Sequence, residues 1–271
     1  MNAPRPISQI PPEFCRRLRL FFTDIDDTIT TGGLLPAESY AAVWRLHESG
    51  IAVVPVTGRP AGWCDHIARM WPVAAVIGEN GAFYYSYDRN SRRMSRVPLI
   101  GERERREGRE KLERVRDRVL KEVPAARVAA DQLFRITDLA IDFCEDVDPP
   151  LSGAQIDRIC SIIDEEGATY KISSIHINCW YGSFDKVSGV VRFLADRGRD
   201  LKEEAIQDSV LFSGDSPNDE PMFAALRHSV AVANIRRFLP RLSHLPAYLT
   251  ERESAAGFGE AVQTILDKRE V

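Results

Sequence analysis

The sequence predicts an α/β protein built on a doubly wound parallel sheet, Rossmann-like in arrangement, with an α+β unit inserted into it. Near both ends of the 271-residue chain, short apolar runs alternate with segments of helical periodicity. This alternation is typical of parallel strands joined by helices. In the middle of the chain, charged helices and alternating apolar and polar positions favour an antiparallel sheet covered on one face. We therefore expect a core formed by residues 1–82 and 183–271, and an α+β cap formed by residues 83–182.

The first half of the core contains three apolar runs that predict strands, over residues 18–23, 51–56 and 74–77. Helical spacing between them predicts one helix over residues 36–49, stopped by Gly50, and a second that ends near Met70. The first strand runs into Asp24 and the second into Thr57. A polar cluster therefore follows each of the first two strands.

The inserted unit is predicted to contain a hairpin, two helices and two further strands, over residues 84–97, 102–123, 152–166, 139–144 and 175–180. The last strand has an apolar face formed by Ile175, Ile177 and Cys179, and a polar face formed by His176, Asn178 and Trp180. Successive side chains of a strand point to opposite faces. The apolar face is therefore expected to pack against helices, which leaves the polar face for the core.

The α/β rhythm returns at Lys186, where a helix is predicted to begin. Strands are predicted over residues 210–213 and 230–233, and the segment between them contains Gly214-Asp215-Ser216-Pro217-Asn218-Asp219. Proline is favoured in the first turn of a helix, so a further helix is expected after Pro217.

The composition is that of an ordinary soluble globular protein, with 44% hydrophobic and 28% charged residues. A net charge of −4 indicates no general attraction to nucleic acid or to anionic membranes. Basic residues do concentrate in residues 102–121, but acidic residues interleave with them, as on a solvated helix face. We therefore expect no nucleic-acid partner.

Features that would direct the chain to a membrane or out of the cell are not apparent. No apolar run approaches the roughly 18 residues of a membrane span, and residues 1–20 lack the apolar segment of a signal peptide. The five cysteines are odd in number and never in a CxxC spacing, which favours free thiols in a reducing compartment. A cytoplasmic protein without a membrane partner is expected, and the sequence does not indicate its oligomeric state.

Four polar motifs occupy positions where predicted strands end or helices begin: Asp24-Ile25-Asp26-Asp27-Thr28, Thr57-Gly58-Arg59, Lys186, and Gly214-Asp215-Ser216-Pro217-Asn218-Asp219. Ligands bind at the carboxyl ends of parallel strands, so we expect these motifs to meet in one crevice. Carboxylates brought together there repel one another unless a cation joins them. The acids concerned are Asp24, Asp26, Asp215 and Asp219. Oxygen ligands without histidine or cysteine favour Mg²⁺.

This set of residue types suits the hydrolysis of a phosphate monoester in a small phosphorylated metabolite. The uncatalysed reaction is so slow that several groups must act together. One carboxylate can attack phosphorus and form an aspartyl-phosphate. A second can protonate the leaving oxygen and later activate water. Cations and hydroxyl donors can hold the phosphoryl oxygens. The sequence offers a candidate for each of these roles.

In this order, the four motifs resemble those of the haloacid dehalogenase-like (HAD) phosphatases, over residues 1–82 and 183–271. Glu79-Asn80-Gly81 and the insertion after it resemble the branch with a large cap, which includes Cof-type, sucrose-phosphate and mannosyl-3-phosphoglycerate phosphatases. The segment that begins at Gly214 and ends at Met222 is especially similar to the last of these. The resemblance implies a sugar phosphate or a glycosyl-phosphoglycerate as substrate.

Residue roles follow from this resemblance. It implies that Asp24 is the nucleophile and that Asp26 is the general acid and base. It assigns phosphate binding to Thr57, Gly58, Lys186 and Asn218. It assigns Mg²⁺ binding to Asp24, Asp26 through its backbone carbonyl, Asp215 and Asp219. Asp27 stands where the family usually has glycine, which adds a charge beside the nucleophile.

The rest of the substrate is expected to meet residues near the entrance and on the cap. The candidates are Arg59, Glu79, Asn80, His176, Asn178 and Trp180. If the cap sheet is lowered over the core, Trp180 can stack on a sugar ring while His176 and Asn178 bond its hydroxyl groups.

Other functions remain open at this stage. A sugar phosphomutase, or another phosphotransferase, would return the phosphoryl group of Asp24 to a second position. A non-catalytic phosphoaspartate switch would retain the phosphoryl group on Asp24, and a ligand-binding module would never phosphorylate Asp24. A dehalogenase is disfavoured because Asp26 has no role in the displacement of halide.

Overall fold

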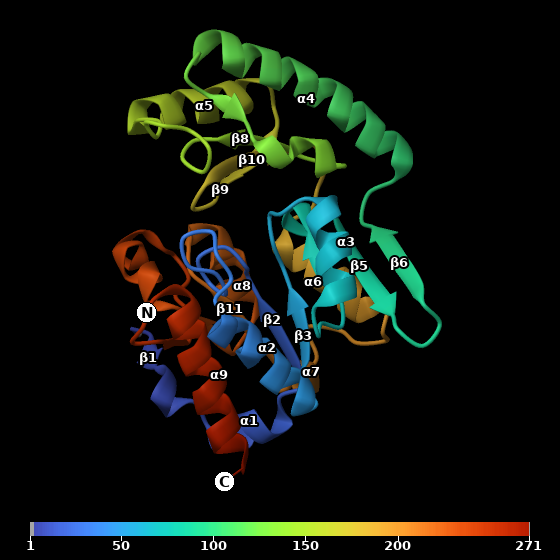
Figure 1. Ribbon diagram of the computed structural model, residues 1–271, viewed down its shortest axis with the longest axis vertical. Helices are drawn as coiled ribbons and strands as arrows, with labels where there is room; N and C mark the ends of the chain where they lie inside the picture. The colour runs from blue at the N-terminus through green and yellow to red at the C-terminus, as the bar shows by residue number, and fades with distance from the viewer. Residues whose placement is uncertain (1–2, 271) are drawn as a thin grey trace.

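The computed structural model describes residues 3–270 and has two parts, a core that holds both ends of the described chain and a cap above it (Figure 1). The core contains a six-stranded sheet in the order β1-β13-β12-β11-β2-β3, and its hydrogen-bonded pairs are parallel. The strands are β1 (Arg5–Pro6), β2 (Leu20–Thr23), β3 (Ala52–Pro55), β11 (Val210–Gly214), β12 (Ser229–Ala231) and β13 (Tyr248–Leu249). The predicted parallel, doubly wound sheet is confirmed.

Helices cover both faces of this sheet because strand side chains alternate between them. In β2, Phe21 packs on the side of α1, α2 and α9, and Phe22 packs on the side of α6 and α8. The helices of the core are α1 (Pro12–Arg17), α2 (Ala37–Glu48), α3 (Ala61–Met70), α6 (Lys186–Ala195), α7 (Glu204–Gln207), α8 (Glu220–Ala225) and α9 (Ser254–Glu270). Two apolar layers therefore hold the sheet rigidly between helices.

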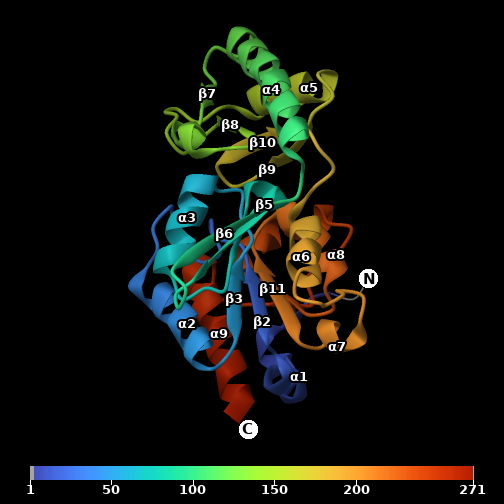
Figure 2. The ribbon, with the colours of Figure 1, turned by 90° about the vertical axis from the view of Figure 1, so that its right-hand side faces the viewer.

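A second, smaller sheet contains a hairpin that lies with the core. Its strands are β4 (Val76–Gly78), β5 (Phe83–Asp88) and β6 (Arg93–Pro98), paired antiparallel in that order. Phe83 and Tyr85 pack with side chains of α3 in one buried cluster, and Figure 2 shows the hairpin beside the core. The sequence placed residues 83–98 in the cap. The structure places them with the core, because the aromatic side chains of β5 complete its packing.

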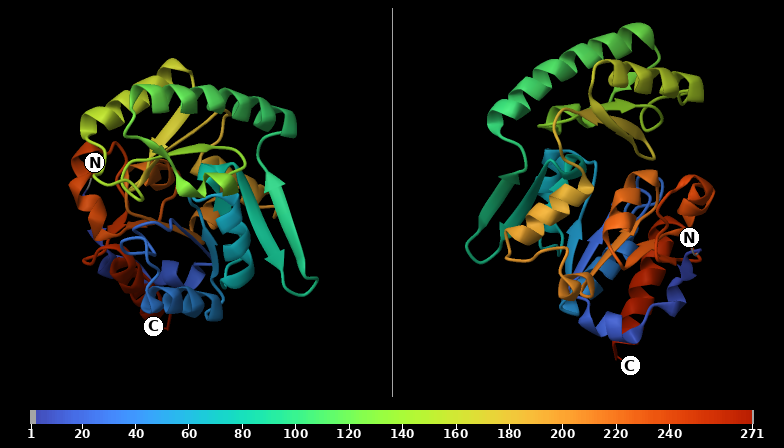
Figure 3. Two further views of the ribbon diagram at one scale, coloured as in Figure 1. Left: turned by 45° about the horizontal axis from the view of Figure 1, so that its top comes forward. Right: turned by 180° about the vertical axis from the view of Figure 1, so that it is seen from behind.

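The cap is a four-stranded antiparallel sheet with two helices on one face, in the order β7-β8-β10-β9. Its elements are α4 (Glu102–Glu122), β7 (Arg127–Val128), β8 (Leu139–Asp142), α5 (Gly153–Glu165), β9 (Thr169–Ile172) and β10 (His176–Trp180). Ile141 and Ile177 pack against α4 and α5, which lie on the outer face of the cap (Figure 3). The polar face of the sheet is therefore buried between the cap and the core.

Short 3₁₀-helices connect several elements: η1 (Ile7–Gln9), η2 (Glu79–Gly81), η3 (Ala130–Phe134), η4 (Pro217–Asp219), η5 (Ala233–Arg237) and η6 (Leu239–Arg241). Between residues 3 and 270, no helix combines the length and the apolar character that a membrane crossing requires. All five cysteines are free. The cytoplasmic location stays a prediction.

Candidate active site

Three buried carboxylates gather at the carboxyl edge of the core sheet. Asp24 follows β2 and Asp215 follows β11, and these two strands pair with Thr23 opposite Ser213. Asp219 lies in η4, just beyond Asp215. Each of these acids has a carboxylate oxygen within 4.8 Å of those of the other two. The parallel register therefore brings acids from distant parts of the chain to one point.

Lys186 joins two of these acids. Its Nζ donates hydrogen bonds to Asp24 Oδ1 at 3.0 Å and to Asp219 Oδ1 at 2.7 Å. Burial alone would lower the pKa of Lys186, but Asp219 and Asp24 raise it, so the ammonium group stays charged. Lys186 begins α6, which lies against Gly81, where a Cβ would come within 1.9 Å of the Asp185 carbonyl oxygen. Gly81, with φ of 105°, allows this close approach.

The remaining negative charge fits a divalent cation held by oxygen ligands. Burial raises the pKa of Asp24 to about 7, against the opposing effect of Lys186. Burial and Asp219 raise the pKa of Asp215 well above its usual value. Within residues 3–270, Asp215 Oδ2 is buried without a hydrogen-bond partner. A hard ion with a preference for oxygen would satisfy this atom and favour the ionised acids.

Asp219 is a weaker candidate ligand than the other two acids of this cluster. Its Oδ1 accepts from Lys186, and its Oδ2 accepts from the backbone N–H groups of Asp215 and Ser216. The two bonds to backbone N–H groups hold the loop after β11 in shape and fix the position of Asp215 at its start. Asp24 and Asp215 are therefore the better placed metal ligands, with Asp219 behind them.

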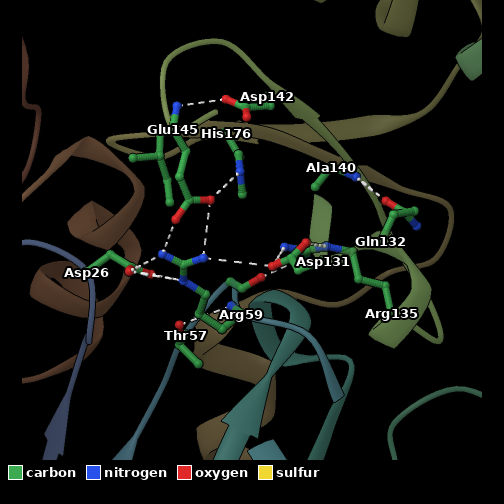
Figure 4. A network of polar contacts seen from close by, with 12 residues as sticks. Asp26, Thr57, Arg59, Asp131, Gln132, Arg135, Ala140, Asp142, Glu145 and His176 are labelled. Atoms are coloured by element: carbon green, nitrogen blue, oxygen red, sulfur yellow. Dashed lines mark hydrogen bonds and ion pairs between the residues drawn. The ribbon is translucent and has the colours of Figure 1, made fainter. Parts of the chain in front are cut away.

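Asp26 directs its carboxylate toward Arg59 (Figure 4). Arg59 Nε donates to Asp26 Oδ1 at 3.0 Å, and Nη2 donates to the same oxygen at 2.8 Å. Nη2 also donates to Glu145 Oε1 of the cap at 2.8 Å. His176 Nε2 lies 2.9 Å from Glu145 Oε2. Arg59 thus joins the core to the cap through charge-assisted hydrogen bonds.

The charge state of Glu145 follows from its neighbours. His176 and Arg59 lower the pKa of Glu145 to about 2, so its carboxylate is ionised at neutral pH. Arg59 also lies over the ring of Trp63, with its guanidinium carbon 4.3 Å from the ring centroid. The guanidinium is therefore held between two carboxylates and an aromatic face. Only the backbone carbonyl of Asp26 is left for the metal-binding role that the resemblance assigned to this residue.

The loop after β3 carries Thr57 and Gly58. Thr57 is buried, and its Oγ1 accepts a hydrogen bond from the Arg59 N–H at 3.0 Å, which leaves the hydroxyl proton free to donate. A Cβ at position 58 would come 3.3 Å from Asn80 Nδ2 and 3.5 Å from Asn178 Oδ1. Among the described residues, Asn80 Nδ2 has no hydrogen-bond partner. Two side-chain amides, one from the core and one from the cap, therefore converge on this loop.

One pocket collects most of the predicted site residues. It is lined by Asp24, Asp26, Gly58, Arg59, His176, Asn178, Asp215 and Asn218, together with Ser173, Ser174, Ile175 and Ser216. Its free volume is about 10 Å³, which is room for about one water molecule. The cap therefore closes the pocket in this structure.

Residues 21–99 match the family model of the haloacid dehalogenase-like hydrolases, whereas no curated protein matches the sequence. A protein of Thermoplasma acidophilum has a similar structure, with a TM-score of 0.69 at 17% identity, over 92% of this chain and 98% of that one. The sucrose-phosphatase of Synechocystis, solved with sucrose and phosphate, has a TM-score of 0.63 at 14% identity, over 92% of this chain and 98% of that one. A haloacid dehalogenase-like hydrolase of Bacteroides thetaiotaomicron has a TM-score of 0.63 at 15% identity, over 92% of this chain and 99% of that one.

The family model and the solved structures agree on the architecture. This chain has the haloacid dehalogenase-like fold. The predicted resemblance to this fold is therefore confirmed, together with the presence of a cap. In the HAD-like core, the motif residues lie at the end of the sheet that faces the cap.

Trp180 does not meet a substrate in this arrangement. It is fully buried, its ring stacks on Phe184 with centroids 5.4 Å apart, and its Nε1 donates to the Phe184 carbonyl oxygen. Side chains of α3 and β5 enclose the ring. The predicted stacking on a sugar is therefore corrected, because this end of β10 packs against the core.

Glu79 is also fully buried and joins the core to the cap. Its carboxylate accepts hydrogen bonds from the N–H groups of Ala61, Ile136, Thr137 and Asp138. The last three belong to the cap loop that precedes β8. No oxygen of Glu79 is left for a substrate, so its predicted substrate role is replaced by a structural one.

Five polar residues between the cap and the core were not predicted from the sequence: Arg135, Asp138, Glu145, Ser173 and Ser174. Arg135 pairs with Asp138 at 3.0 Å and donates to the Gly58 carbonyl oxygen at 2.9 Å. Asn178 Nδ2 donates to Asp138 at 3.0 Å. Opposite charges three residues apart, just before an apolar strand, were a usable signal for the Arg135–Asp138 pair. No sequence signal indicated the role of Glu145, because its partner Arg59 is 86 residues away along the chain.

Proposed function

We propose that this protein is a Mg²⁺-dependent phosphatase that removes phosphate from a small phosphorylated metabolite, a sugar phosphate in the first place. The observation that carries the proposal is the pairing of Asp24 with Lys186 in a closed pocket that Asp26 also lines. Sucrose-phosphatase, solved with sucrose and phosphate, has the same fold, which supports a sugar phosphate as substrate. A phosphomutase has no observation in its favour.

The chain's own residues can perform both steps. Asp24 attacks phosphorus, the bond to the leaving oxygen breaks, and Asp26 gives a proton to that oxygen. In the second step, Asp26 takes a proton from water, which attacks phosphorus and releases phosphate from Asp24. Lys186 favours the ionised form of Asp24 and holds its carboxylate in place, and Thr57 and Asn218 would donate hydrogen bonds to the phosphoryl oxygens. When bound by Asp24 and Asp215, Mg²⁺ supplies charge neutralisation for these oxygens.

The cap must open for the substrate to reach the pocket. A free volume of about 10 Å³ does not admit a sugar phosphate. The contact between Glu145 and Arg59 joins the cap to a core residue that lines the pocket, whereas Glu79 and Arg135 join the cap and the core through the loop before β8. We infer that the cap opens by separation of Glu145 from Arg59, and that its closure excludes water from the reaction.

Removal of the metal tests the proposed function. Phosphate release from a panel of sugar phosphates and from p-nitrophenyl phosphate is expected to require Mg²⁺. A chelator should reduce it at least about 100-fold, and added Mg²⁺ should restore it. An isomeric sugar phosphate in place of free phosphate would point to a mutase, and a phosphoprotein that persists for minutes to a switch. No release from any ester, by the folded protein with Mg²⁺ present, contradicts the proposal.

Asp26→Asn is expected to separate substrates by their leaving group. An alkoxide of a sugar needs a proton as it leaves, whereas p-nitrophenolate does not. Turnover of sugar phosphates should therefore fall by about 10²- to 10³-fold, against less than about tenfold for p-nitrophenyl phosphate. Steady-state kinetics on both esters provide the measurement, and an equal loss on both would exclude the acid role of Asp26.

A further inference from the structure

We propose that the part of the site that takes the leaving group rejects a second anionic group. The substrate is then the phosphate monoester of a neutral or amine-bearing polyhydroxy alcohol, and not a phosphoglycerate or a bisphosphate. This inference rests on the proposed function and narrows its substrate class. Its basis is a second cavity and the charges that line it.

The second cavity continues from the phosphoryl pocket and has a volume of about 290 Å³. The two share Asp26, Arg59, Ser174 and Ile175 as lining residues. The proton donor of the reaction must contact the leaving oxygen. Because Asp26 lines both spaces, a phosphoryl group beside Asp24 directs its leaving group past Asp26 into this cavity. The cavity is therefore the space for the leaving group.

The ionisable lining of this cavity is acidic. It contains the carboxylates of Asp26, Asp27 and Glu145, and the only cation in its lining is Arg59. Arg59 is already bonded to Asp26 and to Glu145, at 2.8 Å in each case. No free cation of the lining is therefore available for an anionic group of a substrate.

Asp27 is the acid in this lining with no charged partner. In residues 3–270 its carboxylate makes no ion pair within 4.0 Å. Its backbone is fixed, because its N–H donates to Thr30 Oγ1 at 3.0 Å and its carbonyl oxygen accepts from Asn234 Nδ2 at 2.9 Å. Its φ of 55° lies in the left-handed region, which aspartate and asparagine tolerate. The loop thus holds an uncompensated negative charge at the cavity.

A second anion in this cavity would meet two unfavourable conditions. It would lie near Asp27, and it could reach Arg59 only by separating that residue from Asp26 or Glu145, which leaves a partly buried carboxylate unpaired. Hydroxyl groups meet no such cost, because they carry no charge and the Ser174 hydroxyl in the lining can exchange hydrogen bonds with them. An ammonium group would be attracted by the same carboxylates. Charge therefore selects against glycerate-type leaving groups, one of the two substrate classes that the resemblance implied.

The test compares two esters phosphorylated on the same terminal hydroxyl, glucitol phosphate and phosphogluconate. They differ only at the other end of the chain, where the first has a neutral hydroxymethyl group and the second a carboxylate. At low ionic strength, kcat/KM is expected to be at least about tenfold higher for glucitol phosphate, since charges a few Å apart near a protein surface contribute effects of this size. Glucosamine phosphate should be used at least as well as glucose phosphate. A kcat/KM for phosphogluconate equal to or above that for glucitol phosphate overturns the inference.

Two variants connect the preference to its source. Asp27→Asn keeps a residue that tolerates the left-handed region, and Glu145→Gln keeps the shape of the side chain. Each should reduce the preference for glucitol phosphate by about threefold to tenfold. Asp117→Asn, with a side chain 69% exposed on α4, removes the same charge elsewhere and should leave the preference unchanged. If the preference for glucitol phosphate is unchanged in both Asp27→Asn and Glu145→Gln, other residues cause it, and the role of Asp27 and Glu145 is overturned.

Failure of the inference can be told from failure of the proposed function. Turnover of p-nitrophenyl phosphate, with phosphogluconate as the better sugar ester, would leave the phosphatase in place and remove only the charge selection. Release from no ester at all removes both. Mg²⁺-dependent release of phosphate from p-nitrophenyl phosphate, glucitol phosphate and phosphogluconate, with glucitol phosphate preferred over phosphogluconate, supports the proposed function and the inference.

Discussion

Asp24→Asn is expected to lower phosphate release at least about 10⁴-fold, because it replaces the attacking carboxylate with an amide that cannot form the covalent intermediate. The fold should survive this change. Asparagine has nearly the same shape and keeps an oxygen that can accept from Lys186, which bonds Asp24 Oδ1 at 3.0 Å. Loss of one charge also relieves repulsion from Asp215 and Asp219. The metal-free variant should therefore melt at or above the temperature of the wild type.

The measurement combines single-turnover phosphate release with trapping of the phosphoprotein in acid. Wild type should yield a phosphorylated protein, and Asp24→Asn should yield none. The stabilisation by Mg²⁺, seen as a rise in melting temperature, should shrink in the variant because one ligand has lost its charge. Asp117→Asn again serves as the control. Turnover within about tenfold of wild type would exclude Asp24 as the nucleophile.

The acids of the site could be predicted from the sequence because each follows a strand or begins a helix. In a parallel sheet the carboxyl ends of neighbouring strands share one edge, so a polar cluster after each strand is enough to indicate a common site. The pairing of β2 with β11 brings Asp24 beside Asp215. No knowledge of the loops between them was required.

The cap contacts were harder to predict because they depend on how two separately folded parts face each other. Alternation along β10 correctly turned His176 and Asn178 toward the core, but it assigned Trp180 to the same exposed role. Periodicity distinguishes the two faces of a strand, and it does not say where along a face the partner ends. At Trp180 the core closes against the strand, so the ring is packed there and does not face the pocket.

The hairpin of β5 and β6 shows the same limit. Its change of rhythm suggested the start of a new unit, although the strands extend a small sheet of the core. Hydrophobic pattern along a chain identifies elements, whereas membership of a domain depends on pairings that the pattern does not specify. The bridge from Arg59 to Glu145 is likewise a pairing between loops, where no periodicity exists.

Glu79→Ala is expected to be the most destabilising of the substitutions considered, by about 4 kcal/mol. The Glu79 carboxylate accepts from four backbone N–H groups, at distances between 2.6 Å for Thr137 and 3.1 Å for Asp138. Each buried donor left without an acceptor costs about 1–3 kcal/mol, which water in the vacated space partly offsets. The total is a large part of the 5–15 kcal/mol by which domains are usually stable.

Urea denaturation would measure this loss, and Glu110→Ala on the exposed surface of α4 is the control, with an expected change below about 0.5 kcal/mol. Hydrogen exchange would locate the effect, because the amides of Ile136, Thr137 and Asp138 should exchange faster once their acceptor is gone. Faster exchange confined to these residues and Ala61 would identify Glu79 as the tie between cap and core. A stability within about 1 kcal/mol of wild type, with these amides still protected, would show that other contacts hold the cap loop in place.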